Sequence, residues 1–259
     1  MLFGVIKPGA PAGVPGVADA PPPVASPASE PRGEDPPDQA QPAEPSGGVR
    51  APDGAGGTST TSTGAAAPAA PATPAANKPL SGYTIVLDPG HGGADPGARG
   101  ASGATWEKYN AWFVALDAKA LLEAAGARVV LTRNGDEYVT LAERVELARR
   151  HGAAMFISIH NDWNQNAALR GVTTYYYHEA SLRLANALQA ELVRRLGTRD
   201  VGVLRQPFYV LRMNSIPAVL VELGFLSNRE DEARLADPAY RYRAAEAIYH
   251  GVLNYVTGA

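Results

Sequence analysis

The sequence predicts a single α/β domain with a mostly parallel central sheet flanked by helices on both faces, preceded by a disordered tail. After residue 80, short apolar, β-branched runs alternate with longer segments whose apolar residues recur at helical spacing. This alternation is typical of βαβ units, in which helices connect parallel strands and cover the sheet. The tail is indicated by composition: 17 of the 22 prolines lie in residues 1–80, whereas 18 of the 19 aromatic residues follow residue 80.

Residues 1–80 are predicted to form a disordered, low-complexity linker rich in Pro, Ala and Gly. Such a segment cannot bury enough apolar surface to offset the entropy lost on ordering. We interpret it as a spacer that holds the folded domain, residues 81–259, away from an anchor; the alternative is an extension without that role. Residues 1–6 are apolar but too few for a secretory signal, and no basic residue precedes them, so the export signal is not convincing.

Charge and composition exclude several classes of protein. Of the 23 basic and 26 acidic residues, 4 and 7 lie in residues 1–80, which leaves 19 of each in the folded part. A neutral domain lacks the basic surface of a nucleic-acid-binding protein. No apolar run reaches the ~18–20 residues of a membrane-spanning helix, so we expect no stable membrane insertion. The absence of cysteine excludes a disulfide scaffold and a Cys-ligated metal site.

The first half of the folded domain is predicted to contain three strands and two helices. The run Tyr-Thr-Ile-Val-Leu is followed by Asp-Pro-Gly, which indicates a buried strand that ends in a loop. Helical spacing begins near Thr105, and Gly126 lies where a capping glycine belongs. In chain order we expect a strand at 83–87, a helix at 105–126, a strand at 128–132, a helix at 140–150 and a strand at 153–159.

The second half is predicted to add three more strands and two helices. Leucine and alanine recur at helical spacing over 182–196, and apolar residues do so again near the end of the chain. In chain order we expect a strand at 172–177, a helix at 182–196, a short strand at 208–211, a strand at 218–223 and a helix at 245–256.

Three apolar strands end in polar residues that a core does not require. His91 follows the first strand within Asp-Pro-Gly-His-Gly-Gly, His160 directly follows the strand at 153–159, and Glu222 lies at the end of the strand at 218–223. In a parallel sheet these ends share one edge, where α/β proteins bind ligands. Two histidines and a carboxylate there have the composition of a zinc site.

A catalytic zinc site needs three protein ligands and an open position for water. Glu107, at the start of the helix after the glycine-rich loop, is near enough in sequence to join His91, which leaves Glu222 free to act as a general base. Structural interpretations remain open: His160 could simply bond to loop backbone, and Glu107 could be a first-turn glutamate favoured by the helix dipole. The other histidines are assigned to surface or packing roles; they are His151, His178 and His250.

Segments of the folded domain, taken in order, resemble the zinc-dependent N-acetylmuramoyl-L-alanine amidases of the type-3 class. The first is Ile-Val-Leu-Asp-Pro-Gly-His-Gly-Gly at 85–93, and the last is Val-Glu-Leu-Gly-Phe-Leu-Ser-Asn at 221–228. The matching segments between them are 95–98, 107–108, 121–127, 130–133, 141–144 and 156–160. The resemblance spans residues 82–257 and leaves the tail outside.

The resemblance implies that His91, Glu107 and His160 bind zinc and that Glu222 is the essential glutamate. The implied reaction is hydrolysis of the amide between N-acetylmuramic acid and L-alanine of the peptidoglycan stem peptide. Zinc would lower the pKa of its water toward ~7 and polarise the carbonyl. Glu222 would take the proton of the water and pass it to the leaving nitrogen. The expected protein is a monomeric autolysin of the cell envelope, periplasmic or secreted, that acts in wall turnover or cell separation.

Two features depart from the family pattern. Activator-regulated members carry a blocking helix in a long insertion after the second histidine, whereas only residues 161–170 separate His160 from the next expected strand. We therefore expect an uncovered site that is active without an activator. Trp163 lies where small residues are common, and we interpret it as a packing residue rather than a substrate contact.

Two other functions use the same residues. A zinc peptidase that cuts within the stem peptide would need the same metal site and would differ only in its substrate groove. A wall-binding module with an inactive site would have no need for Glu222, so the intact set of His91, Glu107, His160 and Glu222 argues against it.

Overall fold

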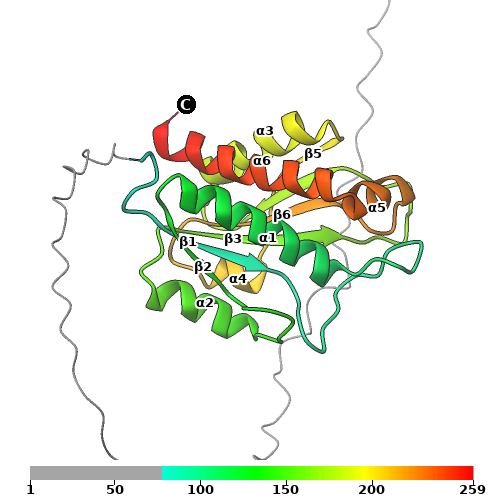
Figure 1. Ribbon diagram of the computed structural model, residues 1–259, viewed down its shortest axis with the longest axis horizontal. Coiled ribbons are helices and arrows are strands. Elements are labelled where there is room, and N and C mark those ends of the chain that lie inside the picture. Colours follow the sequence, from blue (N-terminus) through cyan, green and yellow to red (C-terminus); the bar gives the residue numbers. More distant parts are fainter. Residues whose placement is uncertain (1–77, 259) are drawn as a thin grey trace, which may run out of the picture.

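The computed structural model describes residues 78–258, so the predictions about residues 1–77, including the export signal, lie outside the described residues. At the end of the predicted linker, Leu80 is instead fully buried in the core, and its N–H donates to Ala125 O. Figure 1 shows a central sheet between two layers of helices, which confirms the predicted α/β class. The elements are β1 (Thr84–Pro89), α1 (Glu107–Ala124), β2 (Arg128–Leu131), α2 (Leu141–Arg150), β3 (Met155–Asp162), β4 (Val172–Tyr176), the 3-10 turn η1 (Glu179–Ser181), α3 (Leu182–Leu196), β5 (Asp200–Arg205), α4 (Tyr209–Arg212), β6 (Ala218–Phe225), α5 (Arg229–Ala236) and α6 (Pro238–Thr257).

The described residues form a six-stranded sheet in the order β2-β1-β3-β6-β4-β5. The first four strands are parallel, β4 runs antiparallel to β6, and β5 is parallel to β4. The sheet is therefore mostly parallel, as predicted. Because β1, β3 and β6 run the same way, their carboxyl ends lie at one edge, and His160 on β3 is the register partner of Glu222 on β6.

Helices cover both faces of the sheet. One core layer packs α1, α3 and α6 against the sheet, and a smaller layer lies on the side of α2 and α4 (Figure 1). Alternate residues of β6 face the two layers: Val219 and Val221 belong to the larger core and Leu220 to the smaller one. The same alternation directs Glu222 to the α2 and α4 side.

The helix ends follow the expected local rules. Beyond α1, Gly126 has a φ of 100°, the Gly126 N–H donates to Glu123 O, and the Ala127 N–H donates to Leu122 O. This is a Schellman motif, in which the left-handed position favours glycine. At the start of α2, Thr140 and Glu143 form a capping box.

Four expectations about elements require correction. Residues 208–211 form not a strand but the start of the short helix α4, because a four-residue apolar run does not distinguish the two states. Strand β5 was not predicted, and its side chains are only half-buried, which weakens any apolar pattern. Helix α5 was also not predicted, because its sequence is mostly charged. Helix α6 begins at Pro238 rather than near residue 245, with the Asp237 side chain accepting from the Ala239 N–H.

A buried ion pair lies at the carboxyl end of β1. Arg144 Nη1 donates to Asp88 Oδ1 at 2.7 Å, Thr132 Oγ1 donates to the same oxygen at 2.6 Å, and Ser158 Oγ donates to Oδ2 at 2.6 Å. Burial alone would raise the pKa of Asp88, but the Arg144 charge and the three hydrogen bonds outweigh burial and hold this pKa below its ordinary value. The pair ties α2 to the end of β1.

We expect Asp88→Asn to lower the free energy of unfolding by about 3–5 kcal/mol at neutral pH, because it leaves the buried Arg144 guanidinium without its counter-charge. Because the pKa of Asp88 is lowered in the folded state, its carboxylate stabilises the fold at pH values above the ordinary pKa of 3.8. This stabilisation is lost as the pH falls through the folded-state pKa. The difference between wild type and variant should therefore shrink below about pH 4 in denaturant titrations of metal-free protein.

The matched control is Asp117→Asn on α1, whose half-buried side chain has none of these partners. It should change the free energy of unfolding by no more than about 0.5 kcal/mol. If the difference in free energy of unfolding between Asp88→Asn and wild type did not vary with pH, the ion pair of Asp88 with Arg144 would not be the source of this stabilisation.

Candidate metal centre

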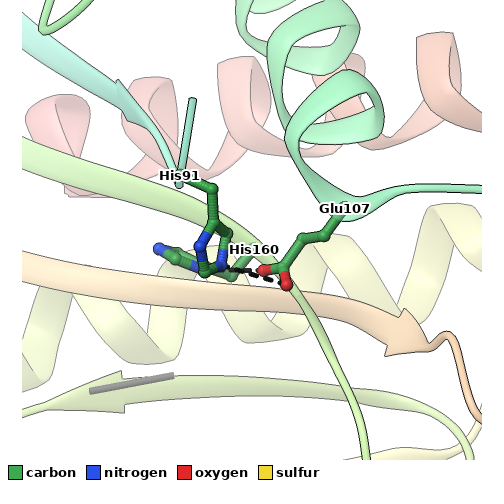
Figure 2. A group of neighbouring side chains, drawn as sticks. All are labelled: His91, Glu107 and His160. Atoms are coloured by element: carbon green, nitrogen blue, oxygen red, sulfur yellow. Dashed lines mark hydrogen bonds and ion pairs between the residues drawn. The ribbon is translucent and has the colours of Figure 1, made fainter. Parts of the chain in front are cut away.

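The structure brings His91, Glu107 and His160 together. One ligand atom from each lies within 4.8 Å of the others. His91 Nε2 is 3.0 Å from Glu107 Oε2, and His160 Nδ1 is 2.8 Å from Glu107 Oε1. Figure 2 shows the three side chains pointing toward one another, with the Glu107 carboxylate facing both imidazoles. The sequence prediction that these residues meet at the sheet edge agrees with this geometry.

Each of the three residues comes from a different element. His91 lies in the loop after β1, Glu107 is the first residue of α1, and His160 lies near the end of β3. His91 has a φ of 60°, the left-handed region that non-glycine residues rarely adopt, so the surrounding structure must hold this loop.

Two glycines make the close approach possible. A Cβ at Gly90 would overlap the His160 ring. A Cβ at Gly97 would lie 2.6 Å from His91 Cδ2 and 2.7 Å from Glu107 Oε2. The absence of a side chain at both positions therefore leaves room for the cluster.

Hydrogen bonds orient the ligand atoms. His91 Nδ1 is 2.7 Å from Asp95 Oδ2, which directs His91 Nε2 toward the other two residues. Glu107 Oε2 accepts from the Ala98 N–H at 2.8 Å, and Oε1 accepts from the Asn161 N–H at 3.0 Å. Asp95 belongs to a segment that carries the family resemblance, but its role was missed because nothing in the sequence shows which residue His91 contacts.

The cluster suits a metal ion. Two imidazole nitrogens and a carboxylate are donors that zinc prefers. His91 Nε2 is buried and, despite its closeness to Glu107, makes no hydrogen bond within the described residues. Burial would lower the pKa of His91, but the Glu107 charge and the Asp95 hydrogen bond outweigh it and raise this pKa to about 10. A metal ion at His91 Nε2 would compete with a proton for this nitrogen.

Glu222 faces the same site. Its buried carboxyl lines a cavity together with His91 and His160. Burial raises the pKa of Glu222 well above its ordinary value, and the charges of Asp162 and Glu107 raise it further. Glu222 is not part of the ligand cluster. A carboxyl beside the ligands but outside the cluster is suited to proton transfer.

The cavity has a mixed lining. Polar residues of the site line part of it, and apolar and aromatic residues line the rest, namely Tyr138, Val139, Leu141, Phe208, Val210 and Leu220. Such a cavity can hold a substrate with polar and apolar parts. Trp163 is half-buried and does not line the cavity, so its packing role stays a prediction.

The remaining histidines lie outside the cluster. His151 caps α2 with Nδ1 3.2 Å from Arg128 Nη2, and His178 Nε2 is 3.0 Å from Arg212 O. His250 lies on α6, with its ring 4.8 Å from that of Tyr249. These contacts agree with the predicted surface and packing roles.

Together, the fold and the site define a class: a single-domain α/β protein with a His–Glu–His candidate metal centre at the carboxyl edge of its sheet. The chain belongs to the N-acetylmuramoyl-L-alanine amidase family Amidase_3, whose family model matches residues 85–254. This confirms the resemblance predicted from the sequence.

Individual relatives agree with the family assignment. N-acetylmuramoyl-L-alanine amidase LytC of Bacillus subtilis is 40% identical over 68% of this chain and 36% of LytC. The probable cell wall amidase LytH of Staphylococcus saprophyticus is 40% identical over 69% of this chain and 60% of LytH. The solved structure of N-acetylmuramoyl-L-alanine amidase AmiC2 of Nostoc punctiforme is similar with a TM-score of 0.66 and 39% identity, over 68% of this chain and 99% of that chain. The match thus spans less than two thirds of LytC and LytH but nearly all of the AmiC2 chain.

We expect Gly90→Ala to weaken metal binding at the candidate centre, measured with zinc, by about tenfold or more, because its methyl group would displace the His160 ring. The dissociation constant can be measured by competition with a chromophoric chelator. Gly135→Ala is the matched control, because a Cβ there would meet no atom within 4 Å and the backbone is not left-handed. Equal zinc affinity in both variants would show that His160 does not bind the metal in the position described.

Proposed function

We propose that this chain is a zinc-dependent N-acetylmuramoyl-L-alanine amidase that cleaves the amide between N-acetylmuramic acid and L-alanine in peptidoglycan. The observation that carries the proposal is the convergence of His91, Glu107 and His160 within 4.8 Å, beside a cavity that Glu222 also lines. Membership of the amidase family supports the substrate. The activity is assigned to the predicted domain, residues 81–259, together with Leu80 of its core, and the residues before Leu80 are proposed as a linker.

Each residue has a role in the proposed reaction. His91, Glu107 and His160 would hold the zinc ion, which supplies a Lewis acid that polarises the amide carbonyl and activates water. Glu222 accepts a proton from the attacking water and delivers it to the leaving nitrogen as the carbon–nitrogen bond breaks. Burial and the charges of Asp162 and Glu107 raise the pKa of Glu222, so this carboxyl holds a proton between the two transfers more readily than an exposed glutamate does.

We further propose that the site needs no activator. The connection between β3 and β4 is residues 163–171; it contains no helix, and none of its residues lines the cavity. The helix that follows, α3, packs against α6 and the sheet as part of the core. Neither the connection after β3 nor α3 is therefore positioned as a blocking helix.

The proposed setting is the cell envelope, periplasmic or secreted, because peptidoglycan lies outside the cytoplasm and the relative LytH is a probable cell wall amidase. The proposed role is that of a monomeric autolysin in wall turnover or cell separation. Within residues 78–258, no helix has the length and apolar character needed to span a membrane.

Digestion of purified peptidoglycan, followed by mass spectrometry of the new termini, tests the function directly. The proposal expects free L-alanine amino groups on unbroken stem peptides. Cuts within the stem peptide would instead indicate the zinc peptidase, and the absence of products would indicate a wall-binding module.

We expect Glu222→Gln to lower the rate by at least about 10²-fold while zinc stays bound, because the amide cannot accept the proton of the water. Zinc content by mass spectrometry and the rate of L-alanine terminus release are measured on the same sample. Glu230→Gln, an exposed substitution on α5, is the control and should keep both. Loss of zinc from Glu222→Gln would mean that Glu222 is a ligand rather than a base.

We expect the purified protein alone to release L-alanine termini at a steady rate that divisome activators do not raise strongly, since the connection after β3 contains no helix and does not line the cavity. The measurement compares initial rates with and without an added activator. A basal rate near zero that rises strongly with the activator would overturn the uncovered-site proposal.

A further inference from the structure

Arg133 is buried beside the candidate metal centre and bonds only to backbone carbonyls. Its side chain is 2% exposed. Nε donates to Pro89 O at 3.0 Å, Nη1 to Gly135 O at 2.6 Å, and Nη2 to both Gly90 O at 3.3 Å and Lys108 O at 2.7 Å. Within residues 78–258 it makes no ion pair, unlike Arg144, which neutralises Asp88.

The carbonyls that Arg133 binds belong to the two segments that carry metal-site residues. Gly90 directly precedes His91, and Lys108 directly follows Glu107. One terminal nitrogen of Arg133 therefore bridges the loop after β1 and the first turn of α1. Across this bridge, His91 Nε2 and Glu107 Oε2 lie 3.0 Å apart.

The chemistry of arginine suits such a bridge. A buried guanidinium is costly unless its donors are satisfied, and stability alone does not favour placing one there without a counter-ion. Its planar fork fixes the directions of several acceptors at once, which a lysine ammonium cannot do. The Trp112 ring, 5.0 Å from the guanidinium carbon, also packs on this group.

The loop needs to be held in place. His91 adopts a left-handed backbone with a φ of 60°, a conformation that costs free energy and persists only where surrounding contacts impose it. Arg144 Nη2 donates to His91 O at 2.9 Å, so arginines bind the carbonyls of three consecutive residues, Pro89 at the end of β1 and Gly90 and His91 in the loop. Of the two arginines, Arg133 is the one that also reaches the segment of Glu107.

We propose that Arg133 is a positioning residue of the metal centre, which fixes the separation of His91 and Glu107 before the metal binds. The inference rests on the proposed zinc site. Without this bridge, the loop after β1 and the first turn of α1 can move apart. Metal binding is then weakened by the entropy that is lost when these two segments become ordered. Groups that orient metal ligands typically change metal affinity by about 10–100-fold when they are removed.

The test uses the full chain with Arg133→Met, which keeps a long side chain but removes the hydrogen bonds, and with Arg133→Lys, which keeps the charge but not the fork. The control is Leu192→Ala, a buried substitution on α3 that lowers stability through the core without touching the site. For each protein we would measure the zinc dissociation constant by chelator competition, the visible absorption spectrum of the Co(II) form and the thermal unfolding of the metal-free form.

The expected result is a zinc dissociation constant raised by about 10-fold or more in Arg133→Met, with an intermediate increase in Arg133→Lys and an altered Co(II) spectrum in both. Leu192→Ala should lower the unfolding temperature but keep the wild-type zinc affinity and spectrum. Arg133→Lys retains the buried charge and decides the question if the Met variant does not fold.

Wild-type zinc affinity and a wild-type Co(II) spectrum in the folded Arg133 variants would overturn the positioning role. The positioning role would also be overturned if Leu192→Ala lost as much zinc affinity as the Arg133 variants, because the loss would then result from lowered stability in general. If wild-type protein itself bound no zinc, the proposed metal site would fail instead, so the two failures are distinguishable.

Discussion

The site depends on one carboxylate, that of Glu107, whose two oxygens face two different histidines. Oε2 lies 3.0 Å from His91 Nε2, and Oε1 lies 2.8 Å from His160 Nδ1. Backbone N–H groups of Ala98 and Asn161 fix the same two oxygens, so the carboxylate cannot rotate freely. Because this buried charge must be satisfied, the loop that connects β1 to α1 folds around it. The ligand geometry and the restriction to glycine at nearby positions follow from this arrangement.

The strand register of the sheet places two further residues of the site, His160 and Glu222. His160 and Glu222 are paired on neighbouring parallel strands, which places a candidate ligand and a candidate base side by side without any special loop. The reversed strand β4 pairs with the other edge of β6, and the connection before it, residues 163–171, contains no helix. The fold thus fixes the proposed proton-transfer residue on a strand, whereas His91 relies on a loop that arginine side chains hold.

Local patterns in the sequence were sufficient to predict the strands that carry the site and the helix that follows the glycine-rich loop. These elements have strong apolar periodicity and clear end signals, such as Gly126 after α1. Strand β5 and helix α5 lack an apolar pattern, and the run at 208–211 was too short to interpret correctly. The role of Glu107 required the family resemblance, because its contact with His160, 53 residues later, depends on how α1 packs. The contacts of Arg133 and Asp95 follow from loop conformation, which no local pattern reveals.

The central claim is that His91, Glu107 and His160 bind one zinc ion while Glu222 stays free. Crystallographic anomalous scattering measured at the zinc edge tests it most directly, because it locates the metal independently of any assumed ligand. We expect one zinc peak about 2.0–2.2 Å from His91 Nε2, His160 Nδ1 and an oxygen of Glu107, with Glu222 outside this distance. A peak that is coordinated by Glu222, or that lies away from the three residues, would contradict it.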